Sequence, residues 1–152
     1  MADTDDPADP PARLRELVSW QAGKVSTLGA RLFARRLPLG ARADFAVLAT
    51  LEEYGALSQA DLGRRLGLDR NDVSGILNRL EAGDQVSRTV DPANRRRNIV
   101  VLTDSGQRRL EELQQYADEV HNELLAGLNA TERRQLQVLL AKLLGNHAPQ
   151  PA

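Results

Sequence analysis

The chain has 152 residues, a formal net charge of −1 and 3% aromatic residues, a length sufficient for one domain with its own core. Cysteine is absent, which excludes disulfides, thiolate metal sites and a cysteine redox switch. No apolar run approaches the roughly 18 residues that a membrane span requires, and the acidic, Pro-rich start of the chain does not resemble a signal peptide. We therefore expect a cytoplasmic protein with no membrane partner.

The first part of the chain predicts a tail followed by a long helix. Residues 1–11 contain four Asp and three Pro, so we expect them to be disordered. Apolar residues from Leu14 to Leu32 recur at every third or fourth position, which predicts one amphipathic helix over residues 12–37. Pro38 then ends it. A second helix is predicted over Ala41–Tyr54, and its nearly continuous apolar middle is typical of a central helix packed on several sides.

Two short helices joined by a tight turn come next. Ser58 and Asp61 have the spacing of a capping box, which opens a helix that ends at Gly67. Asp69 caps the following helix, which ends near Gly83. Two helices this short with a three-residue connection predict a helix-turn-helix. The second helix leaves polar side chains outside its apolar stripe, of the types that contact bases and phosphates: Arg70, Asn71, Asp72, Ser74, Asn78 and Arg79.

A basic β-hairpin is predicted directly behind these helices. Two runs of β-favouring residues, Val86–Val90 and Asn98–Leu102, flank a polar turn, which is typical of a hairpin with a longer loop. The turn contains Asp91, Pro92 and Asn94, and the loop places Arg95, Arg96 and Arg97 at the hairpin tip. With Arg88, the hairpin carries four arginines and one aspartate, a net charge of +3 that favours a phosphate backbone.

Two long helices close the chain. Thr103 is predicted to cap a helix that runs to about residue 128, and Thr131 to cap a last helix that ends before Gly145. Their leucine stripes, with that of residues 12–37, are hard to bury in a monomer of this size, which predicts a homodimer. The expected fold is mainly α with a small β-hairpin wing.

These motifs together resemble the MarR family of winged helix-turn-helix transcription regulators over nearly the whole chain. The segment from Ser58 to Arg88 resembles the family's helix-turn-helix, and the segment from Asp91 to Gly106 resembles its wing, with Asp-Pro, two further residues, paired arginines and a strand ending in Leu-Thr. The family commonly has an acidic residue just before the arginine pair. Here that residue is Asn94, and Asp91 is the acid that would take over its role.

The resemblance implies a winged helix-turn-helix DNA-binding domain over residues 41–103, flanked by dimerisation helices at 12–37 and 104–145. It implies a homodimeric, sequence-specific DNA-binding regulator, a repressor released by a small ligand, that recognises a near-palindromic operator in double-stranded DNA and needs no cofactor. The residues expected at the DNA are Ser58, Arg70, Asn71, Ser74, Asn78, Arg79, Arg88, Asp91, Arg95, Arg96 and Arg97. Of these, the α-helical residues 70–78 would enter the major groove, Arg79 would lie near phosphate, and Arg95 and Arg96 would reach the minor groove.

Several residues keep two interpretations. Arg97 either points to the opposite face from Arg96 or pairs with an acid of its own protein. By the resemblance, a small aromatic or anionic effector would bind in a crevice between the dimerisation helices and the winged domain, lined by Trp20, Lys24, Arg31 and Phe45. The alternative for Trp20 is the apolar core of the dimer interface. Asp118 and His121 share a helical face, but two ligands do not make a metal site, and His147 adds none, so no metal is expected.

Two other functions compete with that of a DNA-binding regulator. A winged helix can instead be a protein-interaction module, but such a wing would not need the three consecutive arginines. An enzyme is disfavoured, because the sequence offers no cysteine, few histidines, no Ser-His-acid grouping, no phosphate loop and no metal-ligand spacing.

Overall fold

The computed structural model of the protein describes residues 9–146, so most of the predicted tail and His147 lie outside the described residues. The helices are α1 (Ala12–Arg15), α2 (Val18–Ala34), α3 (Ala41–Tyr54), α4 (Gln59–Leu66), α5 (Arg70–Ala82), α6 (Asp104–Leu124) and α7 (Ala130–Gly145), and the strands are β1 (Leu57–Ser58), β2 (Val86–Asp91) and β3 (Asn94–Leu102). The protein is therefore mainly α with a small antiparallel sheet, as predicted. Within residues 9–146, no helix combines the length and apolar character that crossing a membrane requires.

The chain divides into two compact units. The winged unit comprises residues 30–118, and the terminal unit comprises the described parts of residues 1–29 and 119–152. These boundaries differ from the predicted division at residues 37–41 and 103–104. The physical reason is packing: Leu110 and Leu113 of α6 are buried in the core of the winged unit, and Leu37 packs against that core.

The core of the winged unit forms around α3. Val47 and Leu48 have no exposed surface, which agrees with the prediction of a central helix packed on several sides. Leu62 of α4 and Leu77 of α5 are equally buried and close the core from the helix-turn-helix. Burial of such side chains, at about 25 cal/mol per Å² of apolar surface, is what holds these short helices in place.

The turn between α4 and α5 is built as the sequence predicted. Ser58 accepts a hydrogen bond from Asp61 N and Asp69 accepts one from Asp72 N, so each helix begins on a side-chain cap. Gly67 has φ 64°, the left-handed conformation that glycine adopts without steric cost, and it ends α4. The amide of Leu68 donates to the Gly63 carbonyl at 2.9 Å and completes the turn.

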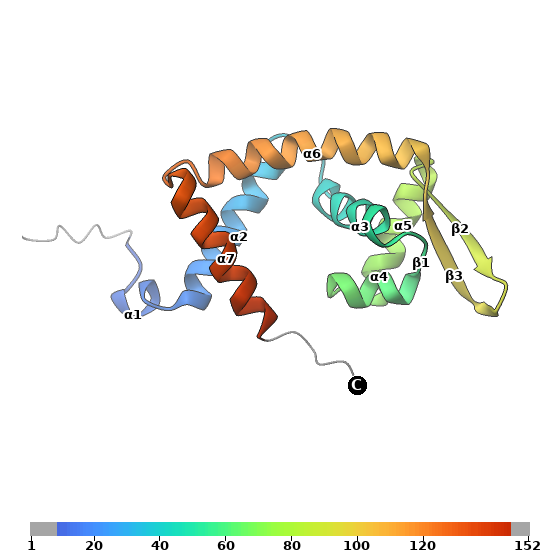
Figure 1. The fold of residues 1–152 in the computed structure, drawn as a ribbon, viewed down its shortest axis with the longest axis horizontal. Helices are drawn as coiled ribbons and strands as arrows, with labels where there is room; N and C mark the ends of the chain where they lie inside the picture. The colour runs from blue at the N-terminus through green and yellow to red at the C-terminus, as the bar shows by residue number, and fades with distance from the viewer. Residues whose placement is uncertain (1–8, 147–152) are drawn as a thin grey trace, which may run out of the picture. The chain divides into compact units, whose positions relative to one another are not determined.

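The sheet has the strand order β1-β3-β2, with both pairs antiparallel (Figure 1). β2 and β3 extend beyond the helices of the winged unit as the wing. Asp91 pairs with Asn94, so the turn is only Pro92-Ala93, and Arg95, Arg96 and Arg97 lie in β3. The regular ladder pairs Val86–Val90 with Asn98–Leu102, the two runs predicted as strands, and its register breaks between Val90 and Asp91. The three arginines lie beyond this regular ladder, as predicted, but in a segment of β3 rather than in a loop. An exposed two-stranded ribbon has no buried face, so its polar residues give no apolar alternation from which to identify a strand.

The first helical segment is interrupted, contrary to the prediction of one helix over residues 12–37. α1 ends at Arg15, α2 begins at Val18, and α2 ends at Ala34. The carbonyl of Arg15, which a continuous helix would pair with a backbone amide, instead accepts a hydrogen bond of 2.6 Å from Gln21 Nε2. No glycine or proline lies at the break, so the sequence carries no helix-breaking residue that would predict it.

The last two helices differ from the prediction at their junction. Thr103 caps α6, accepting a hydrogen bond from Gly106 N at 3.0 Å, as expected. α6 ends at Leu124 rather than near residue 128. α7 is capped by Asn129, not Thr131, because Asn129 and Glu132 form a reciprocal capping box that satisfies two terminal amides at once.

Candidate nucleic-acid interface

One face of α5 is polar and open. At about 100° per residue, Arg70, Asn71, Ser74 and Asn78 lie within an arc of about 100°. The buried side chains of α5, Val73, Ile76, Leu77 and Leu80, occupy the other side of the helix. The geometry therefore brings together the four residues expected in the major groove. We call them the reading face.

Arg79 does not belong to the reading face. It lies about 180° from Arg70 around the helix. Its Nη2 is 2.5 Å from Asp44 Oδ1 and its Nε is 3.4 Å from Asp44 Oδ2. Asp44 is 8% exposed, so the pair joins α5 to α3. The guanidinium is thus engaged by a largely buried carboxylate, and a place for Arg79 near phosphate stays a prediction.

Arg88 joins the wing to α5. Its Nε and Nη2 donate to Glu81 Oε2 at 2.9 and 2.5 Å, and Nη2 also donates to Asn78 Oδ1 at 2.7 Å. The hydrogen bond from Arg88 holds the pKa of Glu81 below its ordinary value. The side chain of Arg88 is 19% exposed. Arg88 is therefore a bridge inside the winged unit, and its expected contact with DNA stays a prediction.

Ser58, also expected at the DNA, is a structural cap. It is 2% exposed. Its hydroxyl donates to Asp61 Oδ2 at 2.5 Å and accepts from Asp61 N at 3.1 Å. The hydrogen bond from Ser58, with the nearby Arg64 guanidinium, lowers the pKa of Asp61. The hydroxyl is used inside the protein, so it is not available to a phosphate.

Asp91 braces the wing from within. Its carboxylate is largely buried, accepting from Ala93 N at 2.9 Å and from Arg97 Nε at 3.1 Å. Asp91 thus holds the tight turn and orients Arg97, which supports the second interpretation of Arg97, pairing with an acid of its own protein. A carboxylate repels phosphate, and this one accepts two hydrogen bonds inside the wing, which favours a supporting role for Asp91 over a direct contact with DNA.

The other wing arginines point into solvent. Arg95 and Arg96 are exposed, and within residues 9–146 no hydrogen bond or ion pair engages either guanidinium. The backbone of Arg96 is fixed, since its amide donates to Asn94 Oδ1 at 3.1 Å. Asn94 therefore orders the chain where the family commonly has an acid, through its amide oxygen rather than a charge.

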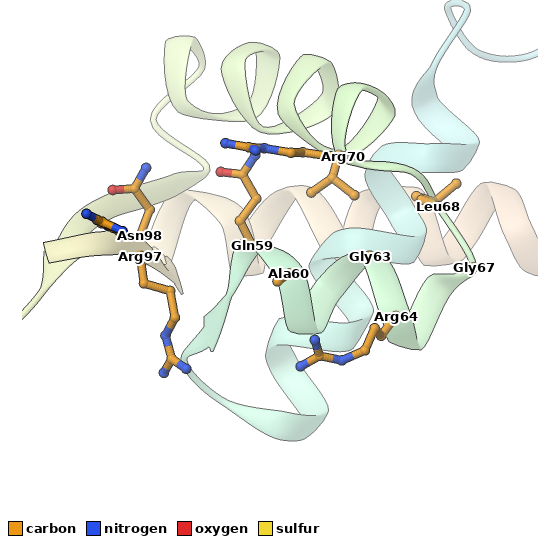
Figure 2. A pocket seen from close by; sticks show the side chains of 11 residues that line it. Gln59, Ala60, Gly63, Arg64, Gly67, Leu68, Arg70, Arg97 and Asn98 are labelled. Atoms are coloured by element: carbon orange, nitrogen blue, oxygen red, sulfur yellow. The ribbon is translucent and has the colours of Figure 1, made fainter. Parts of the chain in front are cut away.

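A groove of about 680 Å³ lies between the helix-turn-helix and the wing (Figure 2). Figure 2 shows the Gln59 side chain reaching from α4 toward Arg70, while Asn98 and Arg97 extend from β3 in opposite directions. The lining contains four arginines and no carboxylate: Gln59, Ala60, Gly63, Arg64, Gly67, Leu68, Arg70, Val73, Arg96, Arg97 and Asn98. Sequence reasoning missed Gln59 and Arg64, because only the pairing of β1 with β3 brings α4 beside the wing.

The residues expected to bind an effector are only partly brought together. Lys24 Nζ lies 5.0 Å from the centre of the Trp20 ring, one turn away on α2, in a cation–π contact. Both residues belong to the terminal unit, whereas Arg31 and Phe45 belong to the winged unit. Their common site therefore stays a prediction. Within residues 9–146 no three potential metal ligands of the His, Cys, Asp and Glu types cluster together.

Comparisons with known proteins agree with this geometry. The model of the MarR family matches residues 42–97. The solved structure of BpsR from Bordetella bronchiseptica is 30% identical, with a TM-score of 0.74 over 83% of this chain and 97% of that one. The chain belongs to the MarR family. A mutant of the MarR protein from E. coli, solved in complex with operator DNA, is 27% identical over 88% of this chain and 94% of that one, with a TM-score of 0.66.

A curated relative is the HTH-type transcriptional repressor NicR of Pseudomonas putida, which is 35% identical over 100 residues. That match covers 66% of this chain and 63% of NicR. The chain thus spans less than two thirds of the length of this relative.

Proposed function

We propose that this protein is a homodimeric, sequence-specific DNA-binding transcription regulator. The observation that carries the proposal is the reading face of α5 standing beside a groove lined by four arginines and no carboxylate. A phosphate backbone is attracted by an excess of positive charge, and base recognition requires exposed hydrogen-bonding groups on an element that fits the major groove. The winged unit supplies both within one surface.

The reading face would enter the major groove, where Arg recognises guanine and Asn recognises adenine. Arg96 and Arg95 would contact the adjacent minor groove or its phosphates. Arg64, in the lining of the groove, would contact the sugar-phosphate backbone beside the reading face. The E. coli relative solved with operator DNA supports this use of the fold.

Dimerisation is supported by unburied apolar side chains on the terminal unit. α7 has no buried residue. The exposed large apolar residues of this unit are Leu14, Leu17, Val18, Val25, Leu28, Val138, Leu139, Leu140, Leu143 and Leu144. A second copy that covers them would bury apolar surface worth about 25 cal/mol per Å². A two-fold dimer presents two α5 helices and therefore requires a near-palindromic operator.

Control by a small aromatic or anionic ligand is the remaining part of the proposal. BpsR is described as regulated in its DNA binding by 6-hydroxynicotinic acid, and NicR is named a repressor. The Trp20–Lys24 pair offers an aromatic face and a cation to such a compound. Release of a repressor follows from linkage: a ligand that binds better to the DNA-free form must weaken DNA binding by the same factor.

Selection of bound duplexes from a random pool, followed by light scattering, tests the proposal. We expect an enriched near-palindrome bound by two copies of the chain. Binding that discriminates no sequence would contradict the proposal and favour a protein-interaction module. A monomer mass at micromolar concentration would contradict the dimer.

A further inference from the structure

Three side chains link the wing to the reading face. Arg88 on β2 donates to Glu81 through Nε and Nη2 and to Asn78 Oδ1 through Nη2. Glu81 and Asn78 are three residues apart on α5, so one guanidinium reaches both. Arg88 is mostly covered, whereas Asn78 is exposed at the outer end of this chain of contacts.

The chemistry of Arg88 decides which way the Asn78 amide faces. A guanidinium has five N–H donors and no acceptor, so the Asn78 atom beside it is the carbonyl oxygen. The amide nitrogen, with two donors, is then directed elsewhere. Rotating the amide by half a turn would place N–H donors against the guanidinium and lose a charge-assisted hydrogen bond. Glu81 keeps Arg88 in place, so the amide has one favoured orientation.

We propose that Arg88, held by Glu81, sets the base preference of Asn78 by fixing its amide with the N–H donors toward the DNA. This inference rests on the proposed function, because it needs α5 in the major groove. Purine N7, guanine O6 and thymine O4 accept hydrogen bonds there, whereas cytosine offers only its N4 donor. Asn78 thus disfavours cytosine at the position it faces. Arg88 is a positioning residue that acts on specificity without touching the base.

The test separates base preference from overall affinity. The wild type first selects a duplex from a random pool. In one half-site of this duplex, the base at each position is then replaced in turn by each of the other three. Affinities are measured for the wild type and Asn78→Ala, and the position where Asn78→Ala loses its preference is the one that Asn78 faces. There the wild type is expected to bind the cytosine duplex roughly 3- to 10-fold more weakly, the value of one net hydrogen bond.

Two substitutions of Arg88 then test its role. Arg88→Met keeps an unbranched apolar side chain but removes the guanidinium and its donors, so the Asn78 amide rotates freely and the penalty against cytosine at that position largely disappears. Arg88→Lys is expected to keep the penalty against cytosine, because an ammonium group is also a donor without an acceptor. A melting curve for each variant shows that it is folded. If Arg88→Met does not fold, Glu81→Gln is expected to reduce the same penalty by loosening Arg88.

Three results would overturn the inference. The first is an Arg88→Met protein that binds all duplexes more weakly but keeps its base preference, because Arg88 is then only a phosphate contact. The second is a wild type that favours cytosine at the Asn78 position. The third is a wild type that selects no sequence, which refutes the proposed function and this inference together, whereas the first two leave the proposed function intact.

Discussion

Arg79 Nη2 lies 2.5 Å from Asp44 Oδ1, which ties α5 to α3 across 35 residues of sequence. Asp44 is 8% exposed, so its carboxylate would lose its cationic partner in a poorly hydrated place if Arg79 were removed. We expect Arg79→Ala to lower the free energy of unfolding by about 1–3 kcal/mol, with the partial exposure of the arginine limiting the loss. Urea denaturation measures this change.

The control for Arg79 is Arg64→Ala. The Arg64 side chain is 72% exposed and pairs with Asp61 within α4, so its loss should cost less than about 0.5 kcal/mol. Arg79→Ala should leave the preferred DNA sequence unchanged. A changed preference with unchanged stability would show that Arg79 contacts DNA after all.

Gly106 lies where a larger residue does not fit. A Cβ at this position would overlap the Gln85 carbonyl oxygen and stand 2.7 Å from Leu102 Cδ1. Gly106→Ala must therefore push α6 away from the chain between α5 and β2, and we expect a loss of about 1–3 kcal/mol in the free energy of unfolding. Gly145→Ala, where nothing lies within 4 Å, is the matched control and should be neutral or stabilising. Equal stabilities of the two variants would contradict the packing described for α6.

Gly75 presents the opposite situation. It lies in the middle of α5, beside the reading face, with nothing within 4 Å of the place that a methyl group would occupy. Gly75→Ala should raise the free energy of unfolding by about 0.5–1 kcal/mol, because glycine is a poor helix former. If α5 approaches DNA as proposed, the added methyl group should nevertheless weaken DNA binding. Thermal melting and binding to the selected duplex measure the two effects, and unchanged binding would place Gly75 away from the DNA.

The pKa of Asp61 predicts a specific dependence of stability on pH. The hydrogen bond from Ser58 lowers the pKa of this carboxyl below its ordinary value of 3.8. A lowered pKa in the folded state contributes stability above pH 3.8 that is lost as the pH falls through the folded value. We expect Asp61→Asn to be less stable than the wild type at pH 7 and the difference to shrink below pH 4. A constant difference across this range would show that Asp61 does not stabilise through its charge.

Arg96 should act on DNA affinity without acting on sequence preference. Its exposed guanidinium would neutralise a phosphate, and each such contact contributes a slope of about −0.9 to the dependence of log affinity on log salt. With one wing per subunit, Arg96→Ala should reduce the slope by about 2 and weaken all duplexes similarly. Arg108→Ala, an exposed arginine on α6 outside the groove, is the control. An unchanged slope in the Arg96 variant would remove the wing from the interface.

Local signals in the sequence predicted the helix-turn-helix correctly. Ser58, Gly67 and Asp69 act through hydrogen bonds and backbone angles within a few residues, so the local sequence was enough to predict the caps and the turn. The extent of β3 was not predictable in this way, since its arginines face solvent and lie in the register irregularity between the Val90–Asn98 and Asp91–Asn94 pairs.

The same contrast holds for the candidate site. The reading face follows from helical periodicity, so Arg70, Asn71, Ser74 and Asn78 were grouped correctly on one face. The surroundings of the other predicted site residues depend on partners in other elements of the fold. Asp44 engages Arg79, and Glu81 and Asn78 engage Arg88. An arginine in a sequence looks equally suited to a phosphate or to a carboxylate, and only the folded chain distinguishes the two.

Ser58 is the last residue of β1 and also the cap of α4, and it is paired with Ile99 in the wing. Detaching the base of the wing would therefore release the first turn of α4 as well, so the two should open as one cooperative unit. In hydrogen exchange, the amides of Asp61 and of the β3 segment that pairs with β1 would share one opening free energy. The outer part of the hairpin, where β3 has only β2 as a neighbouring strand, would exchange sooner. The wing would thus be more stable at its base than at its end, which in the proposed function would let its arginines follow the local width of a DNA groove while the helices stay in register.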